Sequence, residues 1–301
     1  MRIINIAALV LLLAHGSTVC VGQDGFVDGV DLTTIKAPWS MRMLGSDLDI
    51  TRVQVKPDQG SAYFMMISES AKLNVSVFIE PVEKCKTSEE CRDHVLGLGN
   101  PAWGKYQDLA KGKIKDAYYF EFYRPEVQGR PLKMLDMYAQ FVSQGYWVDL
   151  HISKALYEKA DHAAFEKVVN SVVFVPKSGD ATSPFATQAA AGQRTVDSWV
   201  ALWDNRKCRE SHTALSSLTK ADNPEAGWIE HCTKVNDFLG KNKSRNLVAT
   251  AFTRSLPGKT DRPVAIMAYH SDFPKRSAVV EIIALMLEKD SRWVITNYLP
   301  Q

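Results

Sequence analysis

The sequence predicts an α+β protein built from two parts, each with an antiparallel sheet and helices packed against it. Three observations support this class. Apolar residues alternate with period two in the N-terminal half, amphipathic helices precede strands in the C-terminal half, and a segment rich in small residues separates the halves. A length of 301 residues suits two domains. The expected division is a leader at 1–22, a first domain at 24–176, a linker at 177–194 and a second domain at 195–301.

The N-terminus has the pattern of a secretory signal peptide. Arg2 is followed by about a dozen mostly apolar residues, from Ile3 to Ala14, and then by small residues. This run is too short to span a bilayer, which takes ~20 residues. Cleavage after either Gly16 or Gly22 fits the preference for small residues, and acylation of Cys20 is a further alternative. The protein is therefore expected to be secreted or periplasmic, without a transmembrane segment.

Removal of the leader leaves an even number of cysteines. In an exported chain this favours disulfides, and the spacing suggests one bridge in each half, Cys85 with Cys91 and Cys208 with Cys232. A zinc site is the alternative in the second half, where His212 and His231 lie near the cysteines. That spacing matches no standard zinc finger, and oxidation removes free thiolates. We therefore expect neither a metal nor a cofactor.

The first half alternates like a set of strands, at 73–79, 118–123, 133–141 and 146–152. Thr87 and Glu90 form a capping box that predicts a short helix. A longer helix is expected from about Leu156, with a closing strand at 172–175. The stretch Tyr146-Trp147-Val148-Asp149-Leu150, with Phe165 and Asn170-Ser171-Val172-Val173-Phe174, resembles the PsbP-like family. The resemblance implies an α/β/α sandwich and an accessory or binding role without a catalytic set.

The second half begins with an amphipathic helix at 194–205, and another helix around Trp228 ends at Gly240. Strands follow at 247–256, 264–271, 278–287 and 293–298, so a cone of helices and a curled antiparallel sheet is expected. The half resembles a bacterial secreted family, domain of unknown function 4019, related to the nuclear-transport-factor-like cones. The resemblance is carried by Trp199-Val200-Ala201-Leu202, Asp204, Trp228, Leu239-Gly240, Ser244-Arg245, Ser255-Leu256-Pro257-Gly258, Ala278-Val279-Val280-Glu281, Trp293 and Tyr298. It implies no activity.

Glu281 is the one candidate for a catalytic residue. It alternates with Val279, Ile283 and Leu285, so its carboxylate should point to the apolar side of its strand, where desolvation would raise its pKa and suit it to proton transfer. The structural alternative is an ion pair with Arg245. No Ser-His-Asp or Cys-His pattern stands out. Gly97-Leu98-Gly99-Asn100-Pro101-Ala102 spells a dinucleotide fingerprint, but it follows a helix instead of a strand, so a loop is expected.

The net charge and the aromatic residues limit the classes of function that the protein can have. The net charge is +2, with −3 over residues 24–176 and +3 over 195–301, so there is no broad basic surface for nucleic acid. Seven of the aromatic residues in the second half are expected to form either a ligand cleft or the core: Trp199, Trp203, Trp228, Phe252, Phe273, Trp293 and Tyr298. We expect a non-catalytic envelope module that binds a protein partner or a small apolar ligand. The alternative is a small enzyme, an isomerase, dehydratase or hydrolase with Glu281 as its base.

Overall fold

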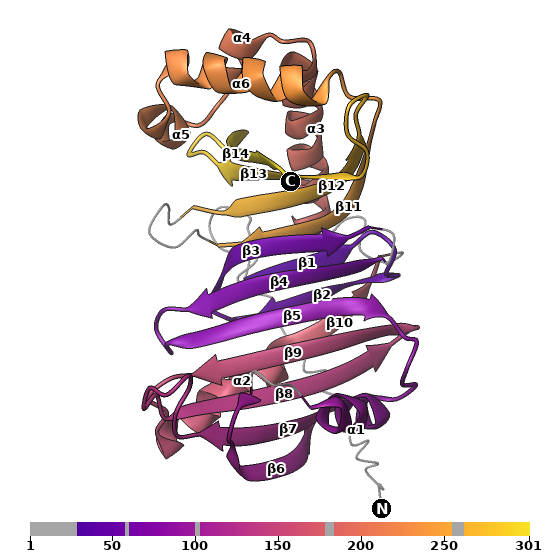
Figure 1. Ribbon diagram of the computed structural model, residues 1–301, viewed down its shortest axis with the longest axis vertical. Helices are drawn as coiled ribbons and strands as arrows, with labels where there is room; N and C mark the ends of the chain where they lie inside the picture. The colour runs from indigo at the N-terminus through magenta and orange to yellow at the C-terminus, as the bar shows by residue number, and fades with distance from the viewer. Residues whose placement is uncertain (1–28, 58–59, 100–102, 178–183, 255–261) are drawn as a thin grey trace, which may run out of the picture.

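The computed structural model describes residues 29–57, 60–99, 103–177, 184–254 and 262–301. Over these residues the chain forms two seven-stranded sheets that lie against each other, with most of the helices at one end (Figure 1). Every pairing between neighbouring strands is antiparallel. The prediction of an α+β protein with antiparallel sheets is therefore confirmed, whereas the cone shape of the second half stays a prediction.

Sheet I combines strands from both halves of the sequence, in the order β10-β2-β1-β11-β12-β13-β14. Its strands are β1 Gly29–Thr34, β2 Trp39–Leu44, β10 Val172–Pro176, β11 Ser244–Thr253, β12 Val264–Asp272, β13 Val279–Leu287 and β14 Trp293–Pro300. The last four correspond to the four strands predicted in the second half. A tight turn at 288–292 joins β13 to β14, and Glu288 N–H donates to Arg292 O at 2.8 Å.

Sheet II is built from the first half alone, in the order β3-β4-β5-β9-β8-β7-β6. Its strands are β3 Leu48–Lys56, β4 Ser61–Ser68, β5 Leu73–Pro81, β6 Gln107–Ile114, β7 Ala117–Arg124, β8 Met134–Ser143 and β9 Tyr146–Lys154. The four predicted strands are β5, β7, β8 and β9, which lie next to one another in the middle of the sheet. The strands β3, β4 and β6 of this sheet were not predicted.

The helices begin and end where capping residues place them. They are α1 Ser88–Leu98, α2 His162–Ser171, α3 Pro184–Asp204, α4 Cys208–Thr213, α5 Ser217–Asp222 and α6 Glu225–Leu239. The Thr87 side chain accepts from Glu90 N–H at 3.1 Å at the start of α1, and Gly240, at φ 82°, ends α6. The expected start of α2 near Leu156 was wrong. Leu156 has φ 54°, and Asp161 bonds back to the Glu158 backbone, so the helix begins at His162.

Two large apolar cores give the molecule its layers. One lies between sheet II and the facing side of sheet I, and it includes Phe64, Val77, Leu150 and Ile266 together with Phe165 of α2. The other lies on the opposite side of sheet I, where α3, α4 and α6 pack. The buried strands of sheet I thus have both faces covered over much of their length. On the side of sheet I that faces sheet II, part of β12, β13 and β14 extends past β3 (Figure 1).

The pairing of β1 with β11 joins the two halves of the sequence, which the sequence did not indicate. Leu32 lies opposite Ala251, and β10, which directly precedes the expected linker, pairs with β2 in the same sheet. Within the expected linker 177–194, residues 184–194 are the first half of α3, and 178–183 lie outside the described residues. The domain boundaries stay a prediction, but the hydrogen-bonded sheet crosses them.

Three other expectations fall wholly or partly outside the described residues. The leader at 1–22 and the alternatives for Cys20 lie there, as do Asn100 to Ala102 of the dinucleotide-like motif. The described part of that motif agrees with the expected loop after a helix, because Gly97 is in the last turn of α1 and Gly99 is its C-cap. None of the helices in the described part of the chain is both long and apolar enough to cross a bilayer.

Candidate functional site

Glu281, the catalytic candidate, lies on β13 and is completely buried. Arg245 of β11 donates to both of its oxygens, from Nε at 2.8 Å and from Nη2 at 3.0 Å. The hydroxyl of Ser271 donates to Oε2, and that of Tyr298 to Oε1 at 2.6 Å. Four donors therefore occupy the carboxylate, which leaves it little capacity to take a proton from a ligand.

Asp204, the C-terminal residue of α3, completes this buried cluster. Its two oxygens accept from Nη1 and Nη2 of Arg245 at 2.8 and 3.1 Å. Burial alone lowers the pKa of Arg245, but the hydrogen bonds that it donates to Asp204 and Glu281 raise it, and the net shift is upward. Burial and the Glu281 carboxylate raise the pKa of Tyr298 well above its usual value. The geometry favours the structural alternative, an ion pair that ties α3 to sheet I.

The aromatic residues of the second half pack mainly on one another. Trp203 lies 5.3 Å from Trp199, 5.6 Å from Trp228 and 4.7 Å from Tyr298, measured between ring centroids. Phe252 and Trp293 belong to the same core, whereas Phe273 packs in a smaller cluster with Leu239 and Val279. Of the two alternatives open from the sequence, the core describes this set better than a ligand cleft.

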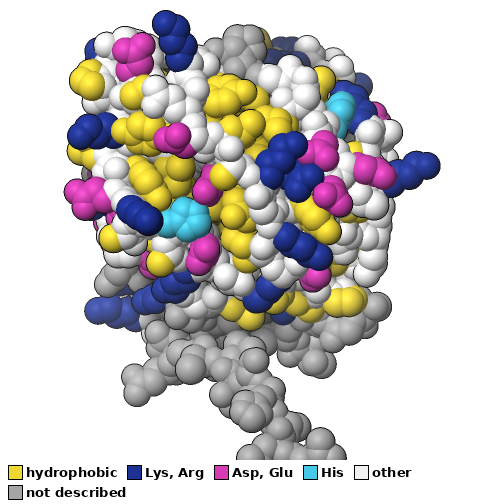
Figure 2. All heavy atoms as spheres, turned by 90° about the horizontal axis from the view of Figure 1, so that it is seen from below, with side chains coloured by type: hydrophobic (Ala, Val, Ile, Leu, Met, Phe, Trp, Pro, Cys, Tyr) yellow, Lys and Arg dark blue, Asp and Glu magenta, His cyan; other side chains and the backbone are white. Residues whose placement is uncertain are grey.

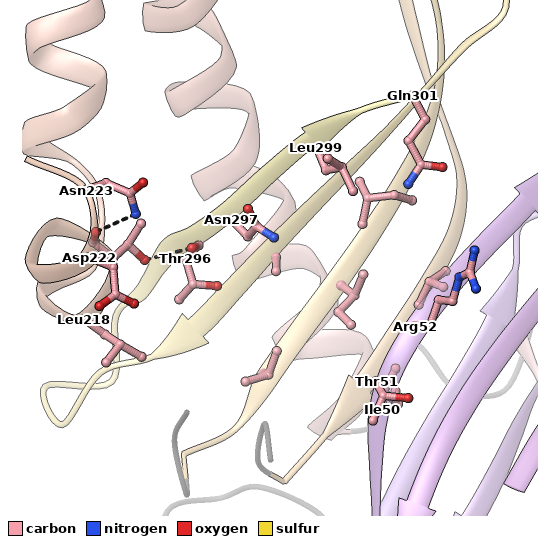
Figure 3. A pocket seen from close by; sticks show the side chains of 16 residues that line it. Ile50, Thr51, Arg52, Leu218, Asp222, Asn223, Thr296, Asn297, Leu299 and Gln301 are labelled. Carbon is pink, nitrogen blue, oxygen red and sulfur yellow. Dashed lines mark hydrogen bonds between the residues drawn. The ribbon is translucent and has the colours of Figure 1, made fainter. Parts of the chain in front are cut away.

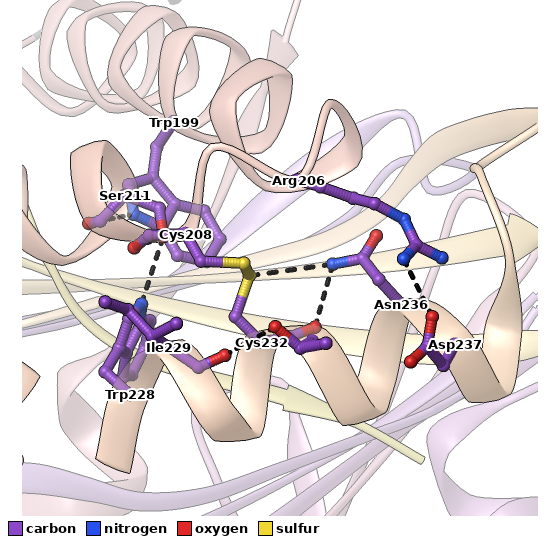
Figure 4. The surroundings of a disulfide bond; sticks show 10 residues. Trp199, Arg206, Cys208, Ser211, Trp228, Ile229, Cys232, Asn236 and Asp237 are labelled. Carbon is purple, nitrogen blue, oxygen red and sulfur yellow. Dashed lines mark hydrogen bonds and ion pairs between the residues drawn. A yellow bond between two sulfur atoms is a disulfide. The ribbon is translucent and has the colours of Figure 1, made fainter. Parts of the chain in front are cut away.

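Both expected disulfides are present, Cys85 with Cys91 and Cys208 with Cys232. The second joins α4 to α6 beside the aromatic core, where Ser211 accepts from the indole N–H groups of Trp199 and Trp228 (Figure 4). His212 bonds instead to the backbone oxygen of Asn223 at 2.9 Å. The bridge leaves neither sulfur as a thiolate, so the zinc alternative lacks its two sulfur ligands.

Removal of each disulfide is expected to lower the free energy of unfolding, by an amount that increases with the length of the loop that the disulfide closes. The sequence separations are 24 residues for Cys208–Cys232 and 6 for Cys85–Cys91. The chain-entropy relation gives about 3.5 kcal/mol for the first and about 2 kcal/mol for the second. The measurement is urea unfolding of two variants, Cys208→Ala with Cys232→Ala and Cys85→Ala with Cys91→Ala. Equal losses, or a greater loss for the shorter loop, would contradict the loop argument.

A second polar cluster lies on the outer face of sheet II. Asp136 is fully buried and binds Arg124 at 2.7 and 3.0 Å and His151 Nε2 at 2.9 Å. The His151 ring stacks on Tyr138 with centroids 4.1 Å apart. His162 likewise has a carboxylate partner, since its Nε2 lies 2.9 Å from Glu121 Oε2. These contacts account for His151 and His162 as structural residues.

Asp149 lies on the same face of β9 as His151 and makes the free energy of unfolding depend on pH. Burial raises its pKa above the ordinary 3.8, and the hydrogen bond from Gln140 only partly offsets this. A raised folded-state pKa contributes stability that is complete below the unfolded value and is lost as pH rises through the folded one. Asp149→Asn is therefore expected to stabilise the protein by about 1 kcal/mol at pH 7, and this gain should vanish near pH 3.5.

Urea unfolding of this variant and the parent at both pH values measures the effect. Asp290→Asn is the control, and its expected effect on stability has the opposite sign, because the hydrogen bond from Arg292 lowers the pKa of Asp290. That substitution should destabilise slightly at pH 7. A gain for Asp149→Asn that is the same at both pH values would contradict the assignment.

A pocket of about 590 Å³ lies between the two sheets, beside the edge strand β3 (Figure 3). Its apolar wall is the side of β12, β13 and β14 that faces sheet II, and polar side chains come from β3, α5 and β14. The lining residues are Ile50, Thr51, Arg52, Val53, Leu218, Thr219, Asp222, Asn223, Val264, Ile266, Ile282, Ala284, Thr296, Asn297, Leu299 and Gln301. Glu281 points to the other face of β13 and lines none of five pockets found among the described residues.

Two β-bulges face this pocket, one in each sheet. The register of β3 shifts between Ile50 and Arg52, which leaves Thr51 as the extra residue. The register of β14 shifts opposite Ala284 and Leu285, where Thr296 is extra. The Thr296 hydroxyl is buried and has no hydrogen-bond partner in the described part of the chain. Bulges re-aim side chains next to binding sites, and an unpaired buried hydroxyl is a polar group still available to a ligand.

The sequence analysis missed this pocket. One signal was present, because Val280, Ile282 and Ala284 make the second face of β13 apolar as well. A continuous apolar run predicts a strand that is covered on both faces. Nothing in the local pattern shows that β3, more than 200 residues earlier in the chain, provides the other wall.

The surface seen from the β6 end carries apolar side chains among lysines and acidic residues (Figure 2). Leu98, Tyr106 and Leu109 are exposed large hydrophobic residues in this part of the fold, and Lys111 pairs with Asp93 at 3.0 Å. Charges of both signs are interspersed on this face, so it presents no field of a single sign.

Comparisons with known proteins give one family match and several distant structural neighbours, two of which follow. No match was found among curated proteins. The solution structure of cyanobacterial PsbP (CyanoP) from Synechocystis sp. PCC 6803 is 13% identical and has a TM-score of 0.35, covering 51% of this chain and 96% of its own. A crystal structure from Bacteroides thetaiotaomicron VPI-5482 is 11% identical and has a TM-score of 0.36, covering 83% and 88%. Scores this low carry no argument about function.

The family match covers the second half. Residues 195–298 match the model described as "Protein of unknown function (DUF4019)". This span includes the residues that carried the resemblance in the sequence, among them the buried cluster members Asp204, Arg245 and Glu281. The match falls on the part of the chain that resembled this family in the sequence.

Proposed function

We propose that the protein is an exported, non-catalytic module that binds a small, largely apolar ligand between its two sheets. The observation that carries this is the 590 Å³ pocket, whose apolar wall includes Val264, Ile266 and Ile282. Ligand sites are concave and mostly apolar, with a few polar groups that set orientation. Here the bulge residues Thr51 and Thr296 supply such groups.

Export is supported by the leader pattern and by the two disulfides, which persist in oxidising compartments. The test is the mass of the protein recovered from cells. A mass that lacks the first 22 residues and four protons supports export with both bridges formed. An intact chain with five free thiols would overturn it.

The binding proposal is tested with N-phenyl-1-naphthylamine, a neutral dye that fluoresces in apolar surroundings. Ala284→Trp places a large ring on the pocket wall, and Ala110→Trp puts the same ring on the exposed strand β6, outside the five pockets. We expect saturable binding by the parent and by Ala110→Trp, and at least a tenfold loss for Ala284→Trp. Binding that is absent from the parent, or insensitive to Ala284→Trp, would overturn the proposal.

A further inference from the structure

We infer that the ligand of this pocket is an amphiphile with one anionic head group, whose head lies at Arg52 and whose apolar body lies against β12, β13 and β14. This inference rests on the proposed function, because it names the chemical class that the same pocket would take. It is carried by the placement of charge around the pocket.

The apolar part of the pocket is the side of sheet I that faces sheet II, and on β13 and β14 it is only partly covered. Ile282 and Ala284 are partly exposed there, and Leu299 is 47% exposed although it is a large apolar residue. They lie next to the buried Val264 and the nearly buried Ile266 of β12. A partly covered apolar face beside a hollow favours a ligand that brings apolar surface of its own.

The positive charge at the pocket lies on its β3 side. Arg52 and Asp222 are the charged residues that line it, and Asp222 already has an interaction of its own. Arg52 is exposed and makes no ion pair within the described residues. It also lines the adjoining pocket of about 410 Å³, where the other charged residue is Lys56. The rim on the β3 side is therefore positive.

The β3 bulge explains why Arg52 is presented to the pocket. Without it, residues would alternate between the core and the surface along the strand. With Thr51 as the extra residue, Thr51 and Arg52 are both exposed, while Ile50 and Val53 on either side are both buried. Two consecutive polar side chains thus stand at the edge of the pocket, and the guanidinium is directed to the solvent face of sheet II, which the adjoining pocket also lines. A guanidinium binds carboxylate and phosphate oxygens with paired hydrogen bonds.

The test uses three twelve-carbon probes below their micellar concentrations, in competition with the neutral dye: dodecanoate, 1-dodecanol and dodecyltrimethylammonium. We expect dodecanoate to bind about tenfold more tightly than dodecanol, and the cation to bind most weakly. Dodecyl phosphate provides a second anion and distinguishes a carboxylate from a phosphate head. Charge-assisted hydrogen bonds are worth roughly tenfold or more in affinity.

The variant that tests the head-group position is Arg52→Gln, with Arg52→Lys as the conservative change. Arg52→Gln is expected to weaken dodecanoate binding about tenfold and to leave dodecanol binding within twofold, and Arg52→Lys should retain most of the affinity. Arg130→Gln removes one positive charge from an exposed loop outside the five pockets and should change neither.

The outcomes separate the inference from the proposed function. If no probe displaces the dye, or the dye itself does not bind, the proposed function fails and the inference fails with it. If dodecanol binds as well as dodecanoate and Arg52→Gln changes neither, the pocket remains a ligand site and the anionic head group is wrong. Equal losses for Arg52→Gln and Arg130→Gln would assign the effect to net charge, which would also overturn the inference.

Discussion

Replacing Glu281 with glutamine is expected to lower the free energy of unfolding by about 3 kcal/mol. Four donors point at the two carboxylate oxygens, two from Arg245 and one each from Ser271 and Tyr298. A glutamine amide offers one oxygen and one NH2 group, so two of these donors would face another donor. Because the site is fully buried, water cannot take over the lost hydrogen bonds.

The measurement is urea unfolding, monitored by circular dichroism. Glu230→Gln is the matched control, because Glu230 pairs with Lys234 on the exposed face of α6. That change should cost less than about 0.5 kcal/mol. If Glu281→Gln is as stable as the parent, the cluster does not stabilise the fold. That result would favour the alternative of an enzyme with Glu281 as its base.

The sequence predicted the second half well because its signals are local. Strands β12, β13 and β14 fall where apolar runs and turns placed them, and Gly240 ends α6 as expected. Even the ion pair between Glu281 and Arg245 could be named, because the parity of β13 put a carboxylate on an apolar face. A buried carboxylate needs a cation, and few candidates were available in the neighbouring strands.

The strands of the first half were harder to predict, because the sequences of β1 and β2 do not have the pattern of buried strands. Both are almost entirely buried, yet they contain Asp31, Arg42 and Ser40. Asp31 pairs with Arg42 at 2.8 Å across the two strands. Polar residues inside a strand look like surface in the sequence, and only the pairing makes them tolerable in a core. Hydropathy alternation therefore could not locate these strands.

The pocket could not be predicted for a different reason. Its walls come from β3, α5 and β12 to β14, which are brought together by the packing of the two sheets. Neither wall has a motif, and the two bulges change the side-chain alternation at Thr51 and Thr296, where a strict period of two predicts the wrong face. Tertiary packing, which local sequence patterns do not encode, determined the site.

The shared sheet leads to the second large expected effect, which concerns the fragment 184–301. Without the first half, the edge of β11 loses its partner β1, and one face of sheet I loses its cover. Val264 and Ile266, which are at most 8% exposed in the full chain, would then face water together with Ala249, Ala251 and Ala268. Exposure of such side chains costs about 1.5 to 3 kcal/mol for each Val or Ile.

We therefore expect this fragment to lose more than about 5 kcal/mol of stability and to self-associate through its unpaired edge. The full chain should unfold in one transition, with coincident curves from tryptophan fluorescence and far-ultraviolet circular dichroism. Sedimentation of the fragment and urea unfolding of both proteins measure these effects. A monomeric fragment with its own cooperative transition at nearly the urea midpoint of the full chain would mean that the pairing of β1 with β11 contributes little. The second half would then be an independent domain that merely docks against the first.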